Sequence, residues 1–265
     1  MNITEHENNI LKVDKIDMDC DHILNSEFVP PLDSFLSGFC MCIVGPSGSG
    51  KTNYLCSLLN KGKRTITNKK TGDKITKQCG FRNVFSNIFI VSPSLHTIKK
   101  SPFADIDDEW KQKELTVESL EMFEDLCEEA KEEAEENEEE RPFNLLILDD
   151  CGTKIRKDKR IESKFNEVVA NRRHKHNCSI IMLLQYTTQI PPSIRSNLTH
   201  VVSFLPKSYA EKENIFTAWT GKQKKFMEQF YDYIFRKPHD TLLIDMTNRS
   251  GNYKFYRNFN LLEFK

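Results

Sequence analysis

The amino-acid sequence predicts an α/β fold, with a mostly parallel central sheet and helices on both of its faces. Five short apolar runs have the length and composition of strands that are buried on both faces. They span residues 39–45, 87–92, 144–150, 179–185 and 200–205. Stretches of helical periodicity alternate with them, which is typical of parallel β-α-β units.

The helices and the last strands follow from the same patterns. Apolar residues recur at helical spacing after Lys51, and a helix with one narrow apolar stripe begins near Thr116. Further helices are predicted within residues 154–175, 209–219 and 222–236. Two strands, at 241–246 and 253–259, are joined by turn-forming residues and complete a small C-terminal α+β extension.

The formal net charge of -1 conceals an uneven distribution of charge. Residues 105–141 hold 18 acidic and 4 basic side chains, whereas the rest of the chain holds 21 acidic and 34 basic ones. The sequence therefore predicts an acidic helical insertion, residues 105–141, in an otherwise basic protein. Eight Lys and Arg residues within 61–82 surround a turn signal at 71–73 and predict an exposed basic hairpin.

We expect three parts along the chain. A polar arm, residues 1–38, leads into a core at 39–220, and the extension at 221–265 packs on that core. No run of about 18 apolar residues exists, so no transmembrane helix is predicted. The first nine residues lack the basic and apolar segments of a secretion signal.

One phosphate-binding motif is complete. The pattern G-x-x-x-x-G-K-[ST] is matched by Gly45, Pro46, Ser47, Gly48, Ser49, Gly50, Lys51 and Thr52. It follows a predicted buried strand and opens a predicted helix, where backbone N–H groups turn toward phosphate oxygens. Lys51 is expected to reach the β- and γ-phosphates and Thr52 to bind Mg²⁺, so ATP and Mg²⁺ are the predicted ligands. The alternative is a Gly/Ser turn that binds nothing.

Polar residues end two other predicted strands. Asp149 and Asp150 close one of them, and Gln185 closes the next along the chain. An open α/β sheet binds ligands beyond the carboxyl ends of its strands, to which the phosphate loop also leads. Asp149 is expected to hold Mg²⁺, Asp150 to orient or deprotonate the attacking water, and Gln185 to contact the γ-phosphate and that water. The alternatives are a helix cap and solvated strand ends.

Arginines near the predicted site are candidates for neutralising charge in the transition state. Arg172 and Arg173 precede the strand that ends at Gln185, and Arg195 follows that strand. Such an arginine often comes from a neighbouring subunit. A solvated basic face is the alternative, because Lys175 is adjacent.

These motifs together resemble the poxvirus-type virion DNA-packaging ATPases, in the FtsK–HerA branch of P-loop ATPases. The resemblance rests on the Asp149-Asp150 strand, the Arg173-His174 pair with residues 177–185, and residues 190–200, and it covers roughly residues 39–216. It implies an additional-strand, RecA-like P-loop NTPase core. It also implies that Lys51 and Thr52 bind phosphate and Mg²⁺, Asp149 binds the metal, Asp150 is the catalytic acid, Gln185 is the sensor and Arg173 is a finger acting in trans.

The resemblance further implies a motor that uses ATP to move double-stranded DNA into the capsid of a large nucleocytoplasmic DNA virus or a virophage. The implied partners are a homo-oligomeric ring, a pentamer or hexamer, and a capsid or portal-vertex protein. The implied location is the host cytoplasm, in the viral factory, and the virion. The acidic insertion, the basic hairpin and the chain after about residue 220 have no counterpart in the resemblance.

Two other functions remain open at this stage. A P-loop nucleotide or nucleoside kinase would use the same first motif, and a nucleotide-gated assembly protein would bind ATP without acting as a motor. The acidic insertion likewise has three interpretations: a solvated helix end, a site for a basic partner, or a shield that prevents DNA binding outside the ring.

Overall fold

The computed structural model describes most of the chain, with gaps mainly before residue 106. The described residues are 3–6, 28–29, 35, 38–60, 64–67, 72, 74–81, 84–94, 103, 106–221, 223–248 and 253–264. Most of the predicted arm, and the predicted turn residues Thr71 and Asp73 of the basic hairpin, lie outside them.

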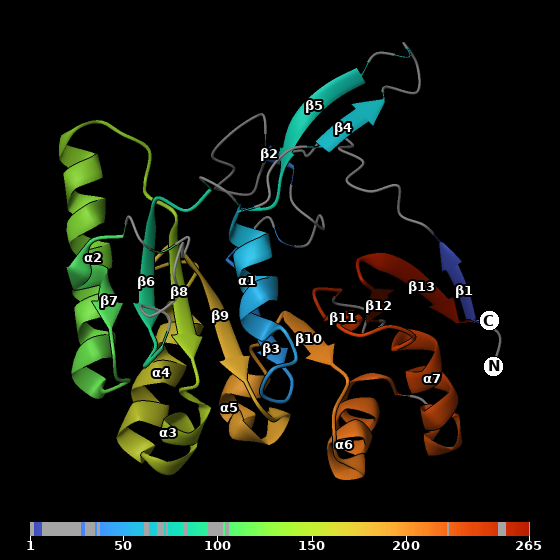
Figure 1. Ribbon diagram of the computed structural model, residues 1–265. Coiled ribbons are helices and arrows are strands. Elements are labelled where there is room, and N and C mark those ends of the chain that lie inside the picture. Colours follow the sequence, from blue (N-terminus) through green and yellow to red (C-terminus); the bar gives the residue numbers. More distant parts are fainter. Residues whose placement is uncertain are drawn as a thin grey trace.

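A ten-stranded sheet runs through the described part of the molecule (Figure 1). Its order is β1 (Ile3–His6), β13 (Asn260–Phe264), β12 (Lys254–Arg257), β11 (Thr241–Asp245), β10 (His200–Phe204), β3 (Cys40–Val44), β9 (Cys178–Leu184), β8 (Asn144–Asp149), β6 (Asn87–Val91) and β7 (Lys111–Gln112). The six strands from β10 to β7 are parallel to one another. Strand β9 lies between β3 and β8, which confirms the predicted additional-strand arrangement.

The remaining strands pair antiparallel and extend the same sheet. Strand β11 pairs with β10, β12 with β11, and β13 with both β12 and β1. The segment after residue 221 therefore contributes its strands directly to the sheet that carries the phosphate loop. The division into arm, core and extension stays a prediction.

Helices cover both faces of this sheet because alternate residues of each buried strand point to opposite faces. Helices α2 (Val117–Glu136), α4 (Lys159–Asn171), α6 (Tyr209–Trp219) and α7 (Met227–Ile234) share one apolar cluster with residues such as Leu146 and Ile180. Helix α1 (Lys51–Asn60) packs in a second cluster with Ile147 and Ile181. No helix of the described residues is long and apolar enough to cross a membrane.

The predicted basic helical stretch is two helices rather than one. Helix α3 (Gly152–Lys157) ends at Lys157, and α4 begins at Lys159, with Asp158 as the cap residue between them. The Asp158 side chain accepts a hydrogen bond from the Arg160 backbone N–H at 2.9 Å. An aspartate cap of this kind starts a new helix and favours a break before it.

The predicted helix at 222–236 is also shorter. A 3₁₀ turn at Lys224–Phe226 precedes α7, which ends at Ile234. The predictions missed β1, β7 and β13, which are short strands at or near the sheet edges.

The acidic insertion forms α2, which Thr116 caps by accepting a hydrogen bond from the Ser119 backbone at 3.0 Å. Leu120, Phe123 and Cys127 bury its apolar stripe. One acid of the insertion is also buried: Glu124 forms an ion pair with Lys164 of α4 at 2.5 Å. The insertion is therefore a packed part of the fold, and most of its other described acids are exposed.

The basic hairpin is present as β4 (Arg64–Thr67) and β5 (Lys74–Cys79), which pair antiparallel. Strand β5 also pairs with β2 (Phe28–Val29) in a small separate sheet. In Figure 1 this hairpin projects from the top of the molecule, whereas α3, α5 (Pro192–Arg195) and α6 lie at the bottom, beyond the carboxyl ends of the parallel strands.

Candidate functional site

The phosphate-loop residues connect β3 to α1. Gly48 and Gly50 have φ angles of 77° and 107°, which other residues rarely adopt. A Cβ atom at Gly45 would lie 2.7 Å from the Ser49 Oγ, so this position has no room for a side chain. The Lys51 Nζ donates hydrogen bonds to the carbonyl oxygens of Gly45 at 2.7 Å and Pro46 at 3.1 Å. The lysine therefore lies over the loop itself.

Asp149 ends β8 and is held by two serines. Its Oδ2 accepts hydrogen bonds from the Ser92 Oγ at 2.8 Å and, at 3.4 Å, from the Ser94 Oγ. Burial raises the pKa of the Asp149 carboxyl, and the Ser92 hydrogen bond opposes that rise. Both serines follow β6, the strand next to β8. Sequence reasoning missed them, although their position beyond a predicted buried strand was a usable signal.

Asp150 and Gln185 lie beside each other although 35 residues separate them in the chain. The Gln185 Nε2 donates to the Asp150 Oδ1 at 3.3 Å. Asp150 has a φ of 56°, a left-handed conformation that aspartate adopts more readily than most residues. This turn of the backbone leaves Asp150 exposed, whereas Asp149 is only 8% exposed.

Gln189 holds the ends of β8 and β9 together. Its Oε1 accepts from the backbone N–H groups of Gln185 at 2.9 Å and Tyr186 at 3.1 Å. Its Nε2 donates to the Thr153 Oγ1 at 3.2 Å. Gln189 thereby connects Gln185 to α3, and nothing in the sequence pattern singled it out.

A pocket of about 360 Å³ collects these groups at the carboxyl ends of the strands. It is lined by Ser47, Gly48, Gly50, Lys51, Thr52, Asn53, Ser94, Asp149, Asp150, Leu183 and Gln185. Burial lowers the pKa of the Lys51 ammonium, and the nearby Asp149 and Asp150 carboxylates act in the opposite direction. The structure thus brings the phosphate loop, the acid pair and the glutamine into one pocket.

The three candidate arginines lie in different surroundings. Arg172 is buried, and it donates to the carbonyl oxygens of Gly38 at 2.9 Å and Val169 at 2.7 Å. Arg195 donates to the carbonyl oxygen of Ile190 at 3.0 Å. Both are engaged with the backbone of their own subunit.

Arg173 is exposed and lies next to Gly38, just before β3 and β9 begin. That is the amino edge of the parallel strands, opposite the edge that holds the pocket. Arg173 is therefore separated from the pocket of its own chain by the length of the strands.

A histidine from the C-terminal segment contacts the phosphate loop. The His239 Nδ1 lies 2.8 Å from the Ser49 carbonyl oxygen, which requires a proton on Nδ1 for a hydrogen bond. His239 has a φ of 67° and precedes Asp240, which is anchored by Asn258 at 2.6 Å and Arg257 at 3.3 Å. Because the contact joins residues 190 positions apart, no local motif indicates it.

The oxygen donors in the pocket fit a magnesium ion bound together with a nucleotide. The Thr52 hydroxyl and the Asp149 carboxylate line the same space. Within the described ranges, no three His, Cys, Asp or Glu side chains are grouped to hold a metal by themselves. Such a sparse protein contribution suits Mg²⁺, which usually keeps several waters and substrate phosphates as ligands.

Comparisons with known proteins agree with this geometry. The family model described as "Poxvirus A32 protein" matches residues 106–240. A curated relative, "Uncharacterized protein 075L" of Invertebrate iridescent virus 6, is 33% identical over 102 residues. That match covers 38% of this chain and 38% of the relative's length.

Two solved structures are similar to this chain. The DNA-packaging ATPase B204 from Sulfolobus Turreted Icosahedral Virus is similar with a TM-score of 0.51 and 14% identity, over 83% of this chain and 97% of that chain. The genome packaging NTPase B204 from Sulfolobus turreted icosahedral virus 2, solved with ATP-gammaS, has a TM-score of 0.46 and 14% identity, over 85% and 98% of the two chains. The first of these likenesses confirms the predicted P-loop ATPase fold.

Proposed function

Because the chain belongs to the poxvirus A32 protein family, we propose that it is an Mg²⁺-dependent ATPase that moves double-stranded DNA into a viral capsid. One observation carries the proposal: a single pocket joins the phosphate loop to Asp149, Asp150 and Gln185. The fold shared with the DNA-packaging ATPase of Sulfolobus Turreted Icosahedral Virus supports it.

The phosphate loop binds ATP through its backbone and Lys51. The positive φ angles of Gly48 and Gly50 let the loop curl around a phosphate chain, and the N-terminus of α1 adds partial positive charge. Lys51 exchanges its bonds to the Gly45 and Pro46 carbonyl oxygens for phosphate oxygens. Thr52 and Asp149 hold the metal, and the bound Mg²⁺ neutralises charge on the phosphates.

Asp150 orients and deprotonates the attacking water, because it is the exposed carboxylate of the pocket. Gln185 donates to that carboxylate and holds its orientation. The same amide is placed to contact the γ-phosphate and the water, so Gln185 reports whether ATP or ADP is bound.

Arg173 acts on the pocket of a neighbouring subunit. Its position at the amino edge excludes contact with its own pocket, whereas a head-to-tail ring places the amino edge of one subunit against the carboxyl edge of the next. We assign Arg173 as the finger, ahead of Arg172 and Arg195, because the latter two bond to backbone carbonyls of their own chain. The proposed assembly is a pentameric or hexameric ring at a capsid or portal vertex, in the host cytoplasm and the virion.

The product of the reaction tests this function. Labelled ATP incubated with the protein and Mg²⁺ is expected to release free phosphate, and duplex DNA is expected to raise the rate. A phosphorylated nucleoside or nucleotide product would instead establish a kinase. ATP binding without turnover, with or without DNA, would establish a nucleotide-gated assembly protein.

A further inference from the structure

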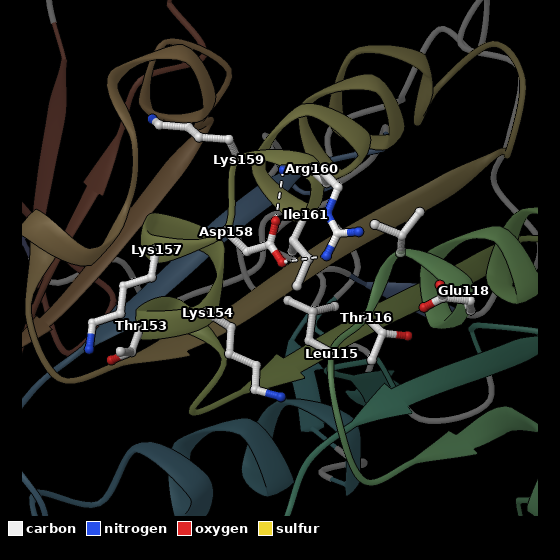
Figure 2. Close-up of a pocket in the computed structure, with 11 residues that line it drawn as sticks. Leu115, Thr116, Glu118, Thr153, Lys154, Lys157, Asp158, Lys159, Arg160 and Ile161 are labelled. Carbon is white, nitrogen blue, oxygen red and sulfur yellow. Dashed lines mark hydrogen bonds and ion pairs between the residues drawn. The ribbon is translucent and has the colours of Figure 1, made fainter.

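A second, larger cleft lies between the start of α2 and helices α3 and α4 (Figure 2). It has a volume of about 660 Å³. Its walls are Leu115, Thr116, Val117, Glu118, Thr153, Lys154, Lys157, Asp158, Lys159, Arg160 and Ile161. No aromatic side chain is among these lining residues, so the cleft has no surface on which a nucleic-acid base can stack.

The α3–α4 wall of the cleft is strongly basic. Residues 154–160 carry five cations and one acid, and three of the cations, Lys154, Arg156 and Lys157, belong to α3. Arg156 and Lys157 are exposed. Within the part of the chain that the structure describes, no acidic side chain lies within ion-pair distance of either.

The acid of this wall is already engaged. Asp158 caps α4 through the Arg160 backbone N–H and pairs with the Arg160 guanidinium at 3.4 Å. Figure 2 shows this pairing, with Lys154 and Lys157 extending away from it; Lys154 forms an ion pair with Glu114. Lys157 in the lining of the cleft, and Arg156 beside it in the chain, therefore keep positive charge available for an anionic ligand.

The cleft is joined to the ATP pocket by a short chain of hydrogen bonds. Thr153 lines the cleft and accepts from the Gln189 Nε2 at 3.2 Å. Gln189 in turn accepts from the Gln185 backbone at 2.9 Å, and the Gln185 side chain donates to Asp150 at 3.3 Å. The hydrogen bonds therefore connect α3 to Gln185 and Asp150, two residues that line the ATP pocket.

Close packing strengthens this connection. Helix α3 begins two residues after Asp150, and its first residue is Gly152. A Cβ atom there would lie 2.7 Å from the Leu184 Cδ2 and 2.8 Å from the Gln189 Cβ. Helix α3 therefore packs against the end of β9 and against Gln189, and its first residue follows Asp150 closely in the chain. Both neighbours connect the position of α3 to the ATP pocket.

We propose that this basic cleft binds the phosphate backbone of duplex DNA and transmits DNA contact to the ATP pocket through Thr153, Gln189 and Gln185. This inference rests on the proposed function, because a motor that moves DNA requires a surface that contacts DNA. Exposed lysine and arginine side chains without stacking aromatics bind the backbone independently of base sequence. That property suits a motor that must move along any sequence.

The test compares charge-removing variants at equal net charge. Lys157→Gln with Lys159→Gln removes two exposed charges from the lining of the cleft, and Lys225→Gln with Lys254→Gln removes two from the C-terminal segment. Fluorescence anisotropy with a labelled duplex of random sequence gives the affinity at several salt concentrations. The cleft variant is expected to bind about tenfold more weakly, with a salt slope reduced by about 2, whereas the control variant matches the wild type.

ATP turnover provides the second measurement. The cleft variant is expected to keep the basal rate and to lose most of the stimulation by DNA. Gln189→Ala is expected to keep DNA affinity while losing stimulation, because it interrupts the connection and leaves the cations in place.

The outcomes separate the inference from the proposed function. If wild-type protein is stimulated by DNA and the cleft variant is stimulated equally with the same salt slope, the cleft does not bind DNA and an acidic protein becomes its expected ligand. If the wild type itself neither binds duplex DNA nor responds to it, the proposed motor function fails, and this inference fails with it.

Discussion

Both edges of the parallel sheet carry motif residues, but the surroundings of those residues differ. At the carboxyl edge, the phosphate loop, Asp149, Asp150 and Gln185 line one pocket, and side chains from neighbouring strands bond to each other. At the amino edge, Arg172 is bonded to the Gly38 backbone and Arg173 is exposed. This difference supports the proposal that one subunit holds the ATP-binding groups and that Arg173 acts on the pocket of a neighbouring subunit.

Removing the lysine of the carboxyl edge has the largest expected effect. Lys51→Ala loses the cation that contacts the phosphates, so turnover is expected to fall by at least about 10³-fold. Steady-state phosphate release measures it, and Lys254→Ala on β12 controls for the loss of a lysine elsewhere. A Lys51→Ala protein that retains a tenth of the wild-type rate would contradict the proposed role of the carboxyl edge in binding ATP.

Substitutions of the two arginines at the amino edge are expected to have different effects, one on turnover and the other on stability. Arg173→Ala should lower turnover about 10³-fold without changing the melting temperature, because its side chain is exposed. Arg172→Ala should instead cost about 2 kcal/mol of unfolding free energy, because it leaves the Gly38 and Val169 carbonyl oxygens unpaired.

Mixing subunits separates a trans role from a cis role. An Arg173→Ala subunit keeps an intact phosphate loop, and a Lys51→Ala subunit keeps an intact finger, so mixed rings are expected to recover part of the activity. Turnover that stays at the level of the separate variants would argue that Arg173 acts within its own chain.

A smaller effect is expected where the C-terminal segment contacts the phosphate loop. His239→Ala removes the donor to the Ser49 carbonyl oxygen and is expected to raise KM for ATP about three- to tenfold, with a smaller change in kcat. His239→Asn is the matched variant, because asparagine tolerates the positive φ and supplies an amide donor. If alanine and asparagine behave alike, the histidine does not position the loop.

The smallest effect concerns stability rather than catalysis. His200 at the start of β10 is fully buried beside Asp245, and burial lowers its pKa to about 4. The unfolded chain therefore binds a proton that the folded chain does not between about pH 6.5 and 4, so stability falls as pH is lowered through this range. His200→Gln is expected to flatten the dependence of melting temperature on pH, and an unchanged slope would exclude this histidine as its source.

The features of the fold and the site that depend on local sequence patterns could be predicted from the sequence. The buried strands, the loop between β3 and α1, and the strand ends at Asp150 and Gln185 all follow from apolar runs and a complete motif. Their meeting in one pocket follows from a general property of parallel sheets. Local patterning therefore carried the prediction of the fold and of which site residues come together.

The missed features depend on contacts between distant segments. Ser92 closes a predicted strand, whereas Gln189 and His239 lie in ordinary loop sequence. Contacts in the folded chain bring them to Asp149, Gln185 and the phosphate loop, respectively. The break between α3 and α4 was also missed. Asp158, which caps α4, lies within a run of basic residues that reads as one continuous helix.

The proposed role of Asp150 is to activate the water that hydrolyses ATP. The direct test measures ATP binding and phosphate release for wild-type and Asp150→Asn proteins, with and without duplex DNA. Asparagine keeps the shape and tolerates the φ of 56° but is a much weaker base. We expect unchanged ATP affinity, loss of hydrolysis and no response to DNA, whereas hydrolysis at the wild-type rate would show that Asp150 does not activate the water.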